Sequence, residues 1–315
     1  KYVSRGLSFR QAEFETETIV LRPDQRKMYD DACDLMQMIR RACIEAVRRT
    51  RSDGKGVWGA YWSVHQRFFK LLCISMKVPA VVAKANQALA KGHCVVIGLQ
   101  TTGEAQDNMA ELKIGEDVTQ FGFVSTTREM LINFLDTHFP TTYVDAADGT
   151  LGDNKVPPDW AKENDWKQAG GAMRDSNDNS DKADVEYTGH YHTNAPRKVD
   201  EDLVAAKEEL ISKVVQLDLP PNFLDAMIDE LGGPDNVAEL TGRSGRVVRR
   251  GGKLVYEARG STTSKKGTSI SGDGDVVGVN IAEKNAFMNG EKFVAIISDA
   301  ASTGISLHAC QGVKN

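Results

Sequence analysis

Two short, wholly apolar runs, Cys94–Gly98 and Phe293–Ile297, constrain the fold of this 315-residue chain most. Apolar runs rich in β-branched residues are typical of parallel strands that helices cover on both faces. Amphipathic helical patterns precede the first run, at about residues 22–50, 58–76 and 79–91. Helix and strand patterns then alternate, so the sequence predicts an α/β fold with a parallel sheet flanked by helices.

The rest of the chain continues this alternation. Proline and glycine mark the predicted ends of several elements, and Gly251 and Gly252 join two short runs as in a hairpin. We expect a helix at 105–112, a strand at 120–124, a helix from 126 until Pro140, helices at 203–217 and 222–231, a short run at 237–240, a hairpin of 246–249 with 254–256, and a helix at 280–288.

Composition excludes several classes of protein. The net charge of −5, from 39 basic and 44 acidic residues, excludes a uniformly basic nucleic-acid coat, so any polyanion contact must be local. Five scattered cysteines without a CxxC pair indicate a reducing compartment. The longest apolar runs are too short to cross a membrane. The chain begins with Lys1 and no apolar leader, so we expect a piece of a longer protein.

Residues 141–200 differ in amino-acid composition from the rest of the chain. They contain 12 acidic and 7 basic residues, but only five Val, Ile, Leu or Phe. Such a segment buries too little apolar surface to offset its ordering entropy, so we predict a disordered polar insertion. His190 and His192 lie within it without a companion Cys or His, and we predict no metal site.

The segment Gly98–Ala105 (GLQTTGEA) nearly matches a phosphate-binding P-loop. That loop requires Lys after its second glycine and then Ser or Thr for magnesium. Glu104 and Ala105 stand at these positions, and a carboxylate there repels phosphate. The chain therefore lacks the means to hydrolyse ATP by itself. The absence of GxGxxG also argues against a Rossmann-type enzyme.

Two other segments are candidates for contact with phosphates. The loop 298–306 follows an apolar strand and carries small and hydroxyl residues, which let a ligand backbone approach the carboxyl edge of a sheet. An ordinary strand-to-helix turn is the alternative. The stretch 241–266 contains eight basic residues and one acid, which indicates a backbone contact or a solvated hairpin. Its candidate residues for nucleic acid are Arg243, Arg246 and Arg249.

The end of the chain resembles motif V of superfamily 2 helicases, and residues 281–307 (IAEKNAFMNGEKFVAIISDAASTGISL) look like the second RecA-like lobe of the strawberry notch family. Residues 19–29, 58–102 and 237–250 (VAELTGRSGRVVRR) resemble the same family. The resemblance implies a RecA-like, P-loop NTPase-like second helicase lobe. Its parts would be a helical entry at 1–92, the lobe at 93–140 and 201–315 without motif VI, and the insertion at 141–200.

The resemblance also implies roles for individual residues. Asp299, Thr303, Gly304 and Ser306 would couple ATP to the bound strand, and Gln100, Thr101 and Ser298 would contact nucleic acid. Thr303 and Ser306 replace the Arg and Asp of the DEAD-box form, which puts a direct ribose contact in doubt. No catalytic residue is expected within the chain, because ATP and Mg²⁺ would be held by a first lobe that it lacks.

Function follows from the same resemblance. It implies an ATP-dependent helicase-like protein of the nucleus, active in transcription and chromatin regulation and linked to Notch signalling. The expected partners are nucleic acid, DNA rather than RNA, together with transcription or chromatin proteins and the missing first lobe, but no membrane. The alternative is an inactive scaffold that keeps the helicase shape and recruits transcription regulators through its surface.

Overall fold

The computed structural model describes residues 13–101, 125–144, 197–259, 274–298 and 307. Several predictions lie outside the described residues. They are the helix at 105–112, the strand at 120–124, the disorder of the insertion between residues 145 and 196, and the conformation of the loop after Ser298.

The first half of the fold is built on two long helices, α1 (Pro23–Thr50) and α2 (Lys55–Ala90). Buried side chains recur along α1 at steps of three and four, as its sequence predicts. Arg51 ends α1 with φ of 53°, and Gly54, with φ of 69°, begins α2. A single α2 replaces the two helices predicted on either side of Pro79, which lies within it.

Packing explains why Pro79 does not end α2. Proline lacks a backbone N–H and disturbs the preceding helical turn, which normally favours a break. Here Met76, Val78 and Val82 are all buried in the main core on both sides of the proline. Burial of each such side chain gains about 1.5–3 kcal/mol, so the shared core outweighs the cost of one proline.

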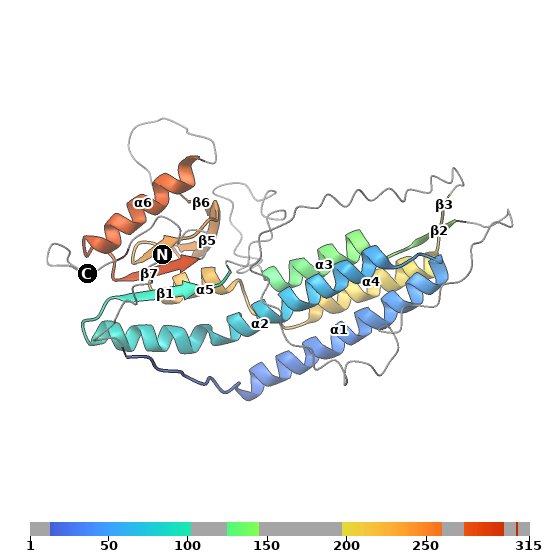
Figure 1. The fold of residues 1–315 in the computed structure, drawn as a ribbon, viewed down its shortest axis with the longest axis horizontal. Coiled ribbons are helices and arrows are strands. Elements are labelled where there is room, and N and C mark those ends of the chain that lie inside the picture. Colours follow the sequence, from blue (N-terminus) through green and yellow to red (C-terminus); the bar gives the residue numbers. More distant parts are fainter. Residues whose placement is uncertain (1–12, 102–124, 145–196, 260–273, 299–306, 308–315) are drawn as a thin grey trace, which may run out of the picture.

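Two further helices, α3 (Thr126–His138) and α4 (Glu201–Gln216), complete a helical bundle with α1 and α2 that extends away from the sheet (Figure 1). Ser125 is the N-terminal capping position of α3. Strand β2 (Thr142–Val144) follows α3 and pairs antiparallel with β3 (Arg197–Val199), just before α4. The two ends of the predicted insertion therefore lie side by side. The largest fully buried side chains of the bundle are Ile39, Phe68, Leu72, Leu131, Leu135 and Val214.

Three parallel strands form the central sheet in the order β1 (Val95–Leu99), β7 (Val294–Ser298) and β4 (Val237–Leu240). Val95 pairs with Val294 and Leu99 with Ser298, while Leu240 pairs with Ile297. The two apolar runs that are almost 200 positions apart in the sequence are therefore direct neighbours. The predicted α/β class with a parallel sheet flanked by helices is confirmed.

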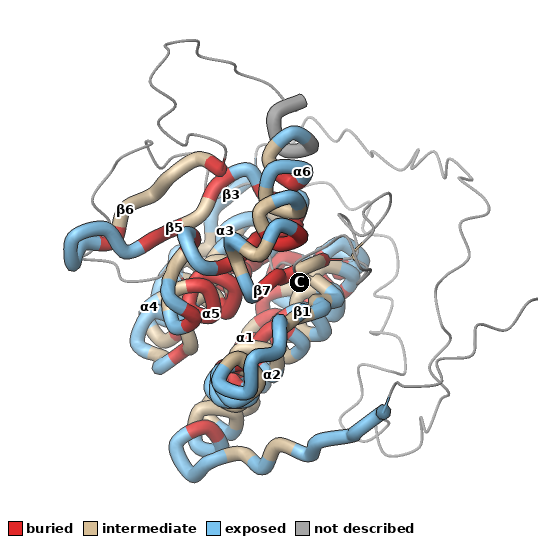
Figure 2. Tube along the Cα trace, turned by 90° about the vertical axis from the view of Figure 1, so that its left-hand side faces the viewer, coloured by how far each residue is buried: buried red, intermediate tan, exposed pale blue. Residues whose placement is uncertain are grey.

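The two faces of the sheet have different covers. Phe287 and Met288 of α6 (Gly274–Met288) pack against Ala295 of β7 on one face. The other face shares the main core with α2 and α5 (Phe223–Glu230), as the buried segments in Figure 2 show. The prediction that both runs are covered on both faces holds for β7, which is central. It is wrong for β1, an edge of the described sheet, where Val96 is 50% exposed.

A separate antiparallel hairpin, β5 (Gly245–Arg250) and β6 (Lys253–Ala258), lies beside α5. Gly251 and Gly252 both have positive φ, 58° and 83°, as a two-residue turn between strands requires. The predicted hairpin is confirmed. None of the helices that the structure describes is long and apolar enough to cross a membrane.

Candidate functional site

The candidate site lies at the carboxyl edge of the parallel sheet. Because Leu99 pairs with Ser298, the residues that follow β1, Gln100 and Thr101, leave the sheet beside the end of β7. Leu240 pairs with Ile297, so Thr241 leaves the same edge from β4. The structure thus brings Gln100, Thr101 and Ser298 to one edge of the sheet. These are the three residues at the ends of β1 and β7 that are predicted to contact nucleic acid.

Ser298 has an unusual environment for a hydroxyl group. Ser298 is 3% exposed, and its buried Oγ has no hydrogen-bond partner among the residues that the structure describes. A buried polar atom left unpaired costs about 1–3 kcal/mol. Open α/β folds bind ligands at the carboxyl edge of a parallel sheet. The Oγ of Ser298 lies at that edge and is a candidate to hydrogen-bond a ligand.

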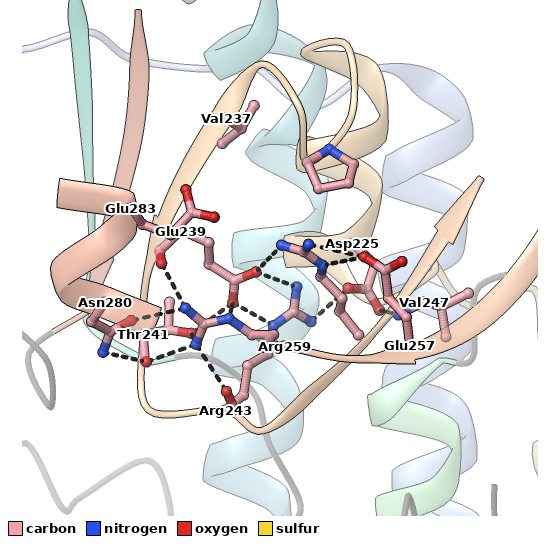
Figure 3. A network of polar contacts seen from close by, with 12 residues as sticks. Asp225, Val237, Glu239, Thr241, Arg243, Val247, Glu257, Arg259, Asn280 and Glu283 are labelled. Atoms are coloured by element: carbon pink, nitrogen blue, oxygen red, sulfur yellow. Dashed lines mark hydrogen bonds and ion pairs between the residues drawn. The ribbon is translucent and has the colours of Figure 1, made fainter. Parts of the chain in front are cut away.

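Beside this edge lies a buried network of charged side chains, which we call the Glu239 network (Figure 3). Glu239, in β4, has no exposed surface. Its Oε1 accepts hydrogen bonds from Arg243 Nε and from Thr241 Oγ1, both at 2.6 Å. Arg243 is 2% exposed, and its Nη1 donates to Asp225 Oδ1 of α5 at 2.5 Å. One arginine thereby joins β4 to α5.

Two more arginines connect the hairpin to the Glu239 network. From the end of β6, Arg259 donates to the carbonyl oxygens of Thr241 at 2.8 Å and Glu239 at 2.6 Å. Arg259 also donates to Asn280 Oδ1 of α6 at 2.8 Å. Arg246 in β5 pairs with Glu257 in β6 at 2.9 Å and with Glu239 at 3.5 Å. The network therefore holds β4, the hairpin, α5 and α6 together.

Electrostatics within the network follow from burial and pairing. Burial alone would raise the pKa of Glu239, but Arg243 and Arg259 outweigh it and lower the pKa to about 2. Burial raises the pKa of Asp225, and Arg243 opposes that effect only in part. Burial acts to lower the pKa of Arg243, yet its two carboxylate partners raise it. Arg243 and Glu239 thus form a charged pair inside the protein.

The structure gives the predicted phosphate-binding arginines other partners. Arg243 is enclosed, and Arg246 is 11% exposed beside Glu257. Arg249 is 49% exposed and pairs with Asp229 at 3.2 Å. A backbone phosphate would have to displace these carboxylates, which is hardest for Arg243. Contact of the cluster with nucleic acid stays a prediction, and it fits Arg249 better than Arg243.

Sequence reasoning missed the network itself. The sequence patterns place Glu239 only in a short apolar run and Arg259 only in the basic stretch 241–266, and they assign no role to Asp225 or Asn280. A signal was present, because Glu239 is the one acid within an otherwise apolar run and Arg243 follows four residues later. A buried acid requires a partner, so this spacing indicates a buried pair. The predicted coupling residues Asp299, Thr303, Gly304 and Ser306 lie outside the described residues.

Comparison with known proteins identifies the family. Residues 222–315 match the helicase family model described as the C-terminal domain on strawberry notch homologue. The whole chain is 38% identical to strawberry notch homolog 1 of Rattus norvegicus over 355 residues, which cover 27% of that protein. The chain belongs to the strawberry notch family. Its segment 222–315 is a helicase C-terminal domain and includes the Glu239 network and β7.

Other strawberry notch relatives match the whole chain as well. Strawberry notch homolog 2 of Homo sapiens is 34% identical, with 25% of its length covered. FORGETTER 1 of Arabidopsis thaliana is 31% identical, with 30% of its length covered. The chain therefore spans about a quarter to a third of the length of these relatives. No solved structure matches it.

Proposed function

We propose that this chain is the RecA-like second lobe of an ATP-dependent, helicase-like strawberry notch protein, and that its sheet edge binds the backbone of nucleic acid. Its helicase C-terminal domain supports this proposal. The observation that carries it is the parallel pairing of β1 and β7, which ends with Leu99 opposite Ser298. Gln100, Thr101 and Ser298 then contribute to one phosphate-binding edge, where ligands of open α/β sheets bind.

Ser298 has a specific role in this proposal. Its Oγ donates a hydrogen bond to a phosphate oxygen and gains a partner that the described residues do not supply. Arg249, at the exposed side of the hairpin, adds a charged contact when its pair with Asp229 opens. Asp299, Thr303, Gly304 and Ser306 carry the coupling to ATP that the motif V resemblance implies.

The chain's own residues do not fit ATP and Mg²⁺. Glu104 stands where a P-loop has its phosphate-binding Lys, and Ala105 stands where it has its magnesium ligand. Within the described ranges, no group of three His, Cys, Asp or Glu side chains is placed to hold a metal ion. The proposal therefore assigns ATP and Mg²⁺ to a first lobe outside this chain and derives no catalytic step from the residues described.

The division of the chain is part of the proposal. Residues 1–92 are the helical entry, 93–140 and 201–315 form the lobe, and 141–200 are a polar insertion. One hydrophobic core contains side chains from the entry and from both parts of the lobe, which supports treating them as one folded unit.

The proposed cellular role follows from the family. We infer that the whole protein acts on DNA rather than RNA in the nucleus, with transcription or chromatin proteins as partners. The competing proposal is an inactive scaffold that uses the surface of the helical bundle to recruit such proteins. The two differ in ATP turnover, because only a motor gains activity when nucleic acid binds.

Substitution of Ser298 by Ala tests the proposal on the complete protein. The hydroxyl has no partner to lose within the described part of the chain, so the fold should be unaffected, while nucleic-acid-stimulated ATP hydrolysis should fall about 10-fold. Ser125→Ala is the matched control, since Ser125 is 5% exposed and its Oγ bonds Thr127 Oγ1 at 2.9 Å. It should lower stability without changing stimulation. Unchanged stimulation in Ser298→Ala would refute the role of the edge, and wild-type ATPase that ignores nucleic acid would favour the scaffold.

A further inference from the structure

Helix α2 has an unusual charge composition. Its 36 residues contain no Asp or Glu, yet they include Lys55, Arg67, Lys70, Lys77 and Lys84, and Lys91 caps its end. The whole chain has 44 acidic residues among its 315. At that average, a segment of 36 residues would contain about five acids. A strongly one-sided charge in a chain of net charge −5 is a local feature of this helix.

The lysines of α2 lie in a row. Lys70, Lys77, Lys84 and Lys91 are spaced by seven residues, and all four are exposed. Seven residues make nearly two helical turns, so the positions drift by only about 20° per step and remain on one face. At about 1.5 Å per residue the row is about 31 Å long. The residues buried on the opposite side of this part of α2 include Phe68, Leu71, Leu72, Met76, Val82 and Ala85.

This row, which we call the α2 lysine row, differs from the arginines of the hairpin. Arg243, Arg246 and Arg249 are each paired with carboxylates. Among the residues that the structure describes, no carboxylate forms an ion pair with the amino group of Lys70, Lys77 or Lys91. Lys84 does have partners, Glu15 and Glu17. The α2 lysine row therefore keeps most of its positive charge available.

The partners of Lys84 come from the segment before α1. Glu13, Glu15 and Glu17 occupy every second position there, and all three are exposed. Glu15 Oε2 lies 3.4 Å from Lys84 Nζ, and Glu17 hydrogen-bonds the same group. Figure 1 shows this segment, in dark blue, running beside the C-terminal half of α2. An acidic segment of the chain therefore already pairs with one lysine of the α2 lysine row.

The length and chemistry of the row indicate its ligand. Separate ammonium groups on one exposed face bind a repeating anion better than a small one, because they form no enclosing pocket. A row of about 31 Å spans about nine base pairs at about 3.4 Å each. Among the apolar side chains between the lysines, Ile74 and Val81 are partly buried against the main core, so this face lacks the large exposed apolar surface that membrane insertion requires. These features favour the phosphate backbone of nucleic acid.

We propose that the α2 lysine row binds the phosphate backbone of duplex nucleic acid without regard to sequence, and that the acidic segment 13–17 competes for part of it. The surface lies on the exposed face of α2, so its role does not depend on the contacts proposed for Ser298. Binding of a duplex along the row displaces Glu15 and Glu17 from Lys84. The segment thereby weakens binding of short or weakly held duplexes.

Salt dependence of binding tests the proposal on the complete protein. The probe is a fluorescein-labelled 20-base-pair DNA duplex of arbitrary sequence, followed by anisotropy between about 50 and 300 mM KCl without ATP. The triple substitution Lys70→Gln, Lys77→Gln and Lys91→Gln should lower the slope of log K against log salt by about 2–3, since each lost phosphate contact removes about 0.9. Affinity near 100 mM salt should fall at least 10-fold.

A matched control carries three Lys→Gln substitutions on other helices, at Lys27, Lys207 and Lys213. Each of these lysines is paired with a carboxylate, and the control should keep the wild-type slope. Equal slopes for the two triple variants, both shown to be folded by circular dichroism, would overturn the proposal. So would loss of binding to phosphatidylserine vesicles in the first variant with an unchanged DNA slope, because that result assigns the row to a membrane.

The acidic segment has its own test. Glu15→Gln with Glu17→Gln should tighten duplex binding by about 2–10-fold, because it removes the competitor and leaves the lysines in place. Unchanged affinity would overturn the competing role of the segment. The sheet-edge proposal is tested by nucleic-acid-stimulated ATP hydrolysis and this one by the salt slope measured without ATP, so failure of either proposal is a separate result.

Discussion

Substitution of Glu239 by Gln probes the buried network most directly. It removes the one negative charge that Arg243, Arg259 and Arg246 share, at distances of 2.6, 3.6 and 3.5 Å. The geometry otherwise stays the same, because Gln has nearly the shape of Glu. Breaking a buried pair by removing one partner costs about 3–5 kcal/mol, since the other charge stays buried without compensation.

That cost is a large part of the total stability of a domain, about 5–15 kcal/mol. We therefore expect the urea midpoint of the 315-residue chain, followed by far-ultraviolet circular dichroism, to fall steeply in Glu239→Gln. Glu45→Gln is the control. Glu45 is also paired with an arginine, Arg48, but at the exposed surface of α1, and its loss should leave the midpoint nearly unchanged.

A double-mutant cycle with Arg243→Met refines the measurement. If Glu239 stabilises the fold by compensating Arg243, the double variant should lose less than the sum of the two single variants, by about 0.5–3 kcal/mol. A loss below about 1 kcal/mol in Glu239→Gln, or additive effects in the cycle, would refute the view that the network is a coupled set of buried charges.

Three further predictions concern the pH dependence of the Glu239 network, the proline within α2 and the pair of β2 with β3. The pKa of Glu239 is lowered from 4.5 to about 2, so its contribution to stability is present above about pH 4.5 and is lost as the pH falls toward 2; acid titration should show a loss of roughly 3 kcal/mol there that Glu239→Gln lacks. Pro79→Ala should raise the free energy of unfolding by about 1–3 kcal/mol, measured in urea, because it restores a helical N–H; lower stability would contradict the packing account of α2. Arg49→Gln breaks ion pairs to Asp200 and Asp202, so amide hydrogen exchange in β2 and β3 should speed up while exchange in β7 stays unchanged; equal rates in all three strands would contradict a local role.

Local patterns in the sequence predicted helices and strands well where neighbouring residues alone determine the element. The step of three and four along α1, the paired glycines at Gly251 and Gly252, and the apolar runs of β1 and β7 each depend on nearby residues. Even the pairing of β1 with β7 follows from the preference of apolar β-branched runs for a common parallel sheet.

The failures depend on distant residues. Pro79 continues a helix because α2 packs on a core that the local sequence does not reveal. Val96 is 50% exposed in β1, at one edge of the described sheet, and neither strand order nor the cover of a strand can be read from strand composition. The basic stretch looked like a phosphate-binding surface because its acids, Asp225 and Asp229, come from α5, outside the stretch.

The pairing of β2 with β3 has a consequence for how this family can vary. Thr142 lies opposite Val199, so the chain leaves the helical bundle and returns to it at the same place, through the paired strands β2 and β3. A hydrogen bond from Arg49 to Asp200 adds a further contact between α1 and this place. Closing a longer loop across fixed ends costs only about 0.6 kcal/mol for each doubling of its length. Insertions, deletions and substitutions between β2 and β3 can therefore occur in evolution without disturbing α3, α4 or the parallel sheet.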